Sequence, residues 1–125
     1  MEGFDWVTSR ALCSPGKVFE KLYLQVKEDV EARNKLLAAS RDAFYVEANN
    51  SRFSVSVPTS PLHPRILFSL VNGETIMVED GKGKLIFEAT LTLNDQGECR
   101  LKVNGQEREF WQVRRMALED LFFPS

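Results

Sequence analysis

The sequence predicts an α+β fold: a long N-terminal helix, a curved seven-stranded antiparallel meander sheet and a short C-terminal helix. Apolar residues first recur with helical spacing, then alternate from residue 44 onwards between short turn-forming pairs, and return to helical spacing at the end. No repeat, low-complexity run or shift in composition divides the chain. We therefore expect residues 1–125 to form a single domain.

The long helix is predicted to run from Pro15 to about Ala39. Ser14 can cap it, and proline suits the first turn because the first backbone N–H groups of a helix have no partner within the helix. Charged side chains lie around most of this helix, but one stripe is apolar, which indicates that one side faces a core. The stripe consists of Phe19, Leu22, Val26, Val30 and Leu37.

Turn-forming residues predict how the strands pair, because residues that flank a short hairpin loop lie opposite each other. Loops at 49–50, 80–83, 94–97 and 104–105 each place apolar residues opposite apolar ones or acids opposite bases. The predicted facing pairs are Val46 with Phe53, Glu47 with Arg52, Val78 with Leu85, Ile76 with Phe87, Leu93 with Cys99, Leu91 with Leu101, Lys102 with Glu107 and Arg100 with Glu109.

The hairpin at Asn72-Gly73 is predicted to be buried on both faces, since apolar residues fill both phases of its strands. One face holds Leu67, Val71, Ile76 and Val78, and the other holds Ile66, Phe68, Leu70 and Met77. The second apolar patch needs a cover. The long helix, the C-terminal segment and another protein chain are the three candidates.

Composition points to an ordinary globular protein in the cytoplasm. Charged residues make up 27% of the chain and the net charge is -2, so no bias toward nucleic acid or anionic membranes is present. No run approaches the ~18 apolar residues of a membrane span, and the N-terminus lacks the pattern of a signal peptide. Cys13 and Cys99 have no metal-binding or redox spacing and are few for a disulfide-built domain, so we expect them to be reduced.

The sequence offers no support for a catalytic site, a metal site or a cofactor. His63 is the only histidine, and it lies in a proline-rich loop. A catalytic role would require Cys13 or a carboxylate within hydrogen-bond reach of it. The glycines of "EDGKGK", residues 79–84, lie between strands rather than before a helix, unlike those of a phosphate loop. On the last strands acidic residues neutralise the basic ones, which disfavours nucleic-acid binding.

The C-terminal segment, residues 109–123, has more apolar residues than one docking stripe needs. A helix is predicted over 113–122, after a last strand that includes Phe110 and carries Trp111 on its polar face. The two adjacent arginines stand at the start of this helix, although cations favour its other end. Two interpretations stay open: the helix completes the core, or the segment is a partner-binding surface formed by Trp111, Arg114, Arg115, Leu118, Phe122 and Phe123.

Two functions follow as hypotheses. The first is a non-catalytic protein-interaction module that binds a partner protein, or itself as a homodimer, through the C-terminal segment and the second apolar patch. The alternative is a binder of a small apolar ligand, with a cavity between the curved sheet and a helix. Its predicted lining is Phe87, Leu91, Leu101 and Phe110.

Overall fold

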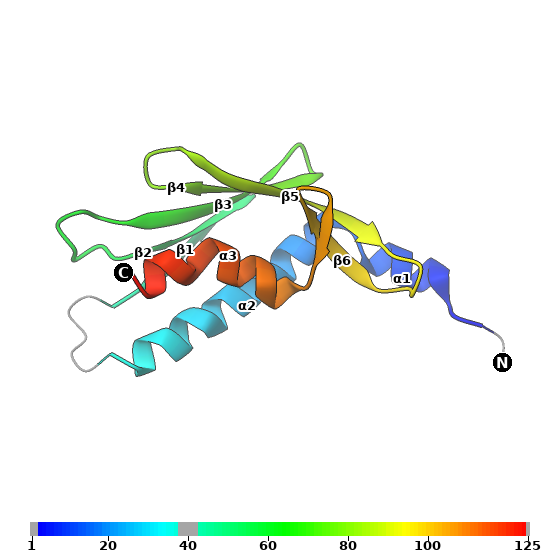
Figure 1. Ribbon diagram of the computed structural model, residues 1–125, viewed down its shortest axis with the longest axis horizontal. Helices are drawn as coiled ribbons and strands as arrows, with labels where there is room; N and C mark the ends of the chain where they lie inside the picture. The colour runs from blue at the N-terminus through cyan, green and yellow to red at the C-terminus, as the bar shows by residue number, and fades with distance from the viewer. Residues whose placement is uncertain (1–2, 38–42, 125) are drawn as a thin grey trace.

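The computed structural model describes residues 3–37 and 43–124 and confirms the predicted α+β fold (Figure 1). A long helix, α2 (Pro15–Lys35), precedes seven strands, and a shorter helix, α3 (Phe110–Phe122), follows them. The strands pair in chain order in one antiparallel, curved sheet with β1 and β7 at its edges. They are β1 (Tyr45–Asn49), β2 (Arg52–Ser56), β3 (Arg65–Val71), β4 (Thr75–Asp80), β5 (Leu85–Leu93), β6 (Cys99–Val103) and β7 (Gln106–Arg108).

Helices α2 and α3 cover the same face of the sheet (Figure 1). The predicted stripe of α2 is confirmed, because Phe19, Leu22, Val26 and Val30 are buried, while Leu37 packs against the core beyond the end of the helix. The helix ends at Lys35, and its predicted end at Ala39 lies outside the described residues.

Aromatic rings form the centre of the core. Phe53 of β2 stacks on Phe68 of β3 with ring centroids 4.5 Å apart. Phe19 and Tyr23 of α2 also contact the Phe53 ring, with centroid distances of 5.1 and 5.3 Å. Helix α2 is therefore attached to the middle of the sheet by one aromatic cluster.

The prediction of a second apolar patch of Ile66, Phe68, Leu70 and Met77 is wrong. Val71 pairs with Thr75, so the β3–β4 loop holds three residues rather than two, with Asn72 and Gly73 in the left-handed region. One extra loop residue moves β4 by one position against β3 and exchanges its two faces. Phe68 and Leu70 now lie opposite Val78 and Ile76 on the core face, whereas Met77 lies opposite Ser69 on the other face. The cover for the core face is α2 and α3, both of which contact β3.

Two other hairpin predictions are also wrong in register. The β1–β2 loop is Asn50-Ser51, so Val46 faces Val55 rather than Phe53, and Glu47 faces Ser54 rather than Arg52. Between β4 and β5 a bulge at Val78/Glu79 shifts the ladder, which pairs Val78 with Phe87 rather than Leu85 and Ile76 with Ala89 rather than Phe87. A bulge adds one residue to a single strand, and nothing in the alternation of apolar residues predicts it.

The β5–β6–β7 hairpins are predicted correctly in their ladders. Leu93 faces Cys99, Leu91 faces Leu101 and Lys102 faces Glu107. The prediction that Arg100 faces Glu109 is wrong because β7 ends at Arg108. Arg100 forms its ion pair with Glu98 instead, at 2.9 Å.

An unpredicted short helix, α1 (Trp6–Leu12), precedes α2, and none of its seven residues, all of them described, is buried. Next to it Cys13 forms a disulfide with Cys99 of β6, so the prediction that both cysteines are reduced is wrong. The Phe4 ring also lies on Gly97, where a Cβ atom would collide with it. These two contacts hold the N-terminal segment against the β5–β6 hairpin.

A candidate partner-binding groove between α2 and α3

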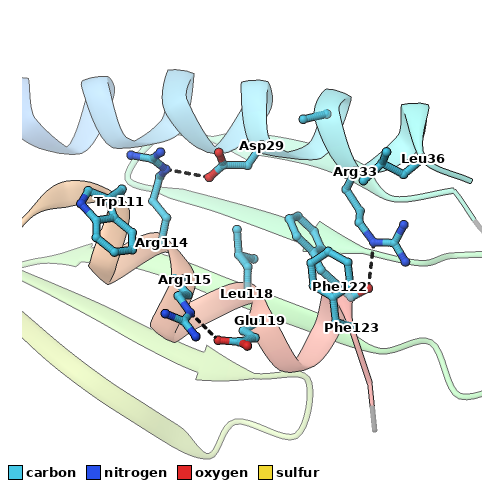
Figure 2. A pocket seen from close by; sticks show the side chains of 11 residues that line it. Asp29, Arg33, Leu36, Trp111, Arg114, Arg115, Leu118, Glu119, Phe122 and Phe123 are labelled. Carbon is cyan, nitrogen blue, oxygen red and sulfur yellow. Dashed lines mark hydrogen bonds and ion pairs between the residues drawn. The ribbon is translucent and has the colours of Figure 1, made fainter.

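A groove of about 410 Å³ runs between α2 and α3, and all six residues predicted for partner binding line it (Figure 2). From α3 and the residue after it come Trp111, Arg114, Arg115, Leu118, Glu119, Phe122 and Phe123, and from α2 and the residue after it come Asp29, Ala32, Arg33 and Leu36. The two sets follow the three- and four-residue steps of one helix face, so each helix presents a single stripe to the groove.

Helix α3 begins at Phe110, three residues before the predicted start at Val113. The backbone N–H of Glu109 donates to Oε1 of Gln112 at 2.8 Å, as in a capping box. Phe110 and Trp111 are therefore helical, and the predictions that Phe110 lies in the last strand and that Trp111 lies on its polar face are wrong. Gln112 supplies only half of the capping-box pattern in the sequence, because glutamate is not a usual N-cap residue, so the pattern gives a weak signal for this helix start.

The lining residues divide into a buried floor and an exposed rim. Leu118 and Phe122 are buried in the core, and the Phe122 ring packs edge-on against Phe44 at 4.9 Å. Leu36, Phe123 and Trp111 remain 71%, 58% and 50% exposed. The expectation that the helix completes the core is therefore confirmed for the floor, and the rim includes three large apolar side chains that the fold leaves in water.

An ion pair between the helices explains the arginine at the start of α3. Nε of Arg114 donates to Oδ2 of Asp29 at 2.6 Å, and Nη1 donates to Oε1 of Gln25 at 3.0 Å. Asp29 contacts Arg114, and Arg33, further along α2, contacts Phe122, further along α3. The two helices therefore run in the same direction. Arg114 thus has a carboxylate partner on α2 that compensates for its unfavourable place in α3.

Arg115 is paired within its own helix. Its Nε donates to Glu119 at 2.7 Å, in an exposed i,i+4 pair on the rim of the groove. This hydrogen bond, together with the charge of the Glu119 carboxylate, raises the pKa of the Arg115 guanidinium. Because both side chains are exposed, the pair contributes little to stability, and it leaves little net charge on this part of the rim.

Arg33 lies at the end of the groove formed by Phe122 and Phe123. The sequence pattern does not predict that this residue lines the groove. Its Nε donates to the backbone carbonyl of Phe122 at 2.8 Å, and its guanidinium lies over the Phe123 ring, 4.6 Å from the centroid. It thereby places a cation at the C-terminal end of α3, whose own last turn carries no basic residue. Within residues 3–37 and 43–124, its guanidinium forms no carboxylate salt bridge.

Removal of Arg114 tests whether the ion pair between the helices stabilises the walls of the groove. In a double-mutant cycle of Arg114→Ala and Asp29→Ala, we expect a coupling free energy of about 1 to 2 kcal/mol, because the pair is hydrogen-bonded and mostly shielded from water. Urea denaturation of the four proteins measures it. A coupling near zero would mean that apolar contacts alone hold α3 against α2.

The described residues provide no cluster of metal ligands and no free thiol for a dyad of Cys13 with His63. No group of three His, Cys, Asp or Glu side chains that could hold a metal ion occurs among them. Cys13 is bonded to Cys99, and His63 lies in the loop between β2 and β3. No helix in the described part of the chain is both long and apolar enough to cross a membrane.

The residues predicted to line a ligand cavity do not line the groove. Phe87 and Leu101 are buried in the core, and Leu91 and Phe110 pack against it. The groove lies between two helices, whereas the predicted cavity would lie between the sheet and a helix. These four residues therefore contribute to packing of the core.

Comparisons with protein-family models, with curated proteins and with solved structures found no match to this chain. We therefore infer function from the groove itself.

Proposed function

We propose that this chain is a non-catalytic protein-interaction module whose α2/α3 groove binds an amphipathic helix of another protein. The observation that supports this is the exposed rim of Leu36, Trp111 and Phe123 around a floor that the core already holds in place. Large exposed apolar side chains that surround a concave surface are typical of binding sites. Because the floor is buried in the fold, little of it has to be ordered when a partner binds.

The shape of the groove favours a helical occupant. Two parallel stripes with three- and four-residue spacing form the walls that a third helix needs for packing. Arg33 supplies a cation at one end of the groove, so an acidic residue on the partner helix would find a complementary charge there.

A second copy of this chain is a poorer occupant. Its exposed apolar helix, α1, has seven residues, or roughly 10 Å at the rise of an α-helix. The wall formed by α3 extends from Trp111 to Phe122, which is roughly 17 Å by the same rise. Helix α1 would therefore leave much of the apolar rim in water.

Rim substitutions test the proposal without damage to the core. We expect Leu36→Asp and Phe123→Asp each to weaken binding of a helical peptide by roughly tenfold or more, since each places a charge at an apolar contact. The probe is a synthetic amphipathic helix with leucines at three- and four-residue steps and one glutamate. Trp111 fluorescence reports binding in a Trp6→Phe background.

Leu62→Asp is the matched control, because Leu62 is 88% exposed in the loop between β2 and β3 and does not line the groove. Equal affinity of all variants, or no binding at all, would contradict the proposal. Phe122→Asp is unsuitable because this side chain is buried. Light scattering over a dilution series should show a monomer at every concentration. A dimer that Leu36→Asp dissociates would instead assign the groove to a second copy.

A further inference from the structure

The outer edge of β1 is a second place where another chain can bind. At the two ends of β2, the N–H of Val57 donates to the carbonyl of Pro64 at 3.1 Å, and the carbonyl of Ser51 accepts from Leu70 N–H at 2.8 Å. Both groups therefore point toward β3. Hydrogen-bonding direction alternates along a strand, so Arg52, Ser54 and Ser56 point toward β1.

The pairing of β1 then decides which of its backbone groups remain open. The residues opposite Arg52, Ser54 and Ser56 are Asn49, Glu47 and Tyr45, so these three form hydrogen bonds with β2. Val46 and Ala48 lie between them and direct their N–H and C=O groups away from the sheet.

The side chain of Asn34 confirms this direction independently. Its Nδ2 donates to the carbonyl of Phe44, and its Oδ1 accepts from Phe44 N–H, both at 2.9 Å. A neighbouring antiparallel strand would form the same two bonds. Phe44 has the same phase as Val46 and Ala48. Among residues 3–37 and 43–124, the edge is therefore closed by α2 at Phe44 and open at Val46 and Ala48.

The open edge lacks the usual protection against pairing. β1 contains no proline and no lysine, and Glu47 is its only charged residue. Beneath Ala48 a hollow of about 450 Å³ lies between α2 and the β1–β2 hairpin, and Glu20 and Tyr23 contribute to its lining. An added strand could therefore form backbone hydrogen bonds at the edge and direct a side chain into the hollow.

The charge of Glu47 decides which kind of chain fits. If a second copy paired antiparallel, with Val46 opposite Ala48, the two Glu47 side chains would face each other, which is destabilising. A pairing centred on Val46 requires Phe44, which Asn34 occupies. A pairing centred on Ala48 extends into the turn at Asn50, where φ is 42°. All three symmetric arrangements are therefore unfavourable.

We propose that the β1 edge binds an extended segment of a different protein as an antiparallel strand, with a lysine or arginine opposite Glu47. The position opposite Glu47 is a non-hydrogen-bonded pair at the outer edge, where facing side chains come closest. This contact is separate from the α2/α3 groove, and neither depends on the other.

Amide hydrogen exchange with two short peptides tests the proposal. One acetylated peptide alternates threonine and valine with lysine at its centre, and the other has glutamate there. We expect the lysine peptide to slow exchange of the Val46 and Ala48 amides and to bind roughly threefold to tenfold more tightly than the glutamate peptide. Glu47→Lys should reverse this preference, and Glu88→Lys, an exposed charge reversal on β5, should leave it unchanged.

Ala48→Pro provides a second variant, because it removes an outward N–H group and no hydrogen bond to β2. It should abolish peptide binding while circular dichroism shows an intact fold. Exchange that neither peptide slows, or the same preference in Glu47→Lys as in the wild type, would overturn the proposal. So would slow exchange of Val46 and Ala48 in the dilute protein alone. Protection that grows with protein concentration would identify a second copy as the occupant and would also overturn it.

Discussion

Phe68→Ala should lower the free energy of unfolding by about 3 to 5 kcal/mol, the range for truncation of a fully buried aromatic side chain. Phe68 is 0% exposed and its ring stacks on Phe53 at 4.5 Å. Its loss leaves a cavity beside Phe53, the ring that the other members of the aromatic cluster of β2, β3 and α2 contact. Urea denaturation followed by circular dichroism measures the change.

Met77→Ala is the informative control for this substitution. A one-residue difference in the β3–β4 loop decides whether Met77 shares a face with Phe68, and the structure places it on the opposite face. We therefore expect a loss of about 1 kcal/mol or less, as for a side chain outside the core. Equal losses in the free energy of unfolding for Phe68→Ala and Met77→Ala would instead support the register that a two-residue loop predicts.

Loss of the Cys13–Cys99 disulfide should lower the free energy of unfolding by about 2 to 4 kcal/mol. The two cysteines are 86 residues apart, so the bond restricts a large part of the unfolded chain. Denaturation in the presence and absence of a reductant measures the difference. The double variant Cys13→Ser, Cys99→Ser should have the stability of the reduced wild type, both with and without the reductant. A change in the stability of that variant on addition of the reductant would show that the reductant acts on something other than this bond.

Reduction should also release α1 locally. No residue of α1 is buried, and its attachment described above consists of the disulfide and the contact of Phe4 with Gly97. Amide exchange in α1 should therefore approach the rate of an unfolded peptide on reduction, whereas the middle of α2, which packs on the aromatic cluster, should stay protected and accelerate only by the factor that the loss of global stability sets. A loss of protection in α1 no larger than that in α2 would mean that contacts other than the disulfide hold this segment.

Local patterns were sufficient to predict most of the fold. The apolar stripe of α2 needs only the period of a helix, and the β6–β7 ladder follows from Asn104-Gly105, a turn that favours positive φ at both positions. Registers failed where the loop length was ambiguous, as at 72–74, or where a bulge intervened, as at Val78/Glu79. Alternation alone specifies neither the bounds of a loop to within one residue nor a bulge within a strand.

Contacts between distant segments were not predictable in the same way. Periodicity identified the α3 residues of the groove but not Asp29, Arg33 and Leu36, because no local pattern shows which faces of two separated helices meet. The reversed charge of Arg114 was a valid signal of a missing partner, and the structure identifies that partner as Asp29. The disulfide was missed because cysteine spacing carries no information about proximity in space.

The two walls of the groove come from opposite ends of the chain, residues 29–36 and 111–123, with the whole sheet between them. During synthesis the first wall is made well before the second, and the surface exists only after the last helix has docked. A partner that recognises both walls would thus discriminate molecules in which α3 is docked on α2 from those in which it is not. Its binding free energy would also add to the stability of the folded chain in proportion to the logarithm of its concentration.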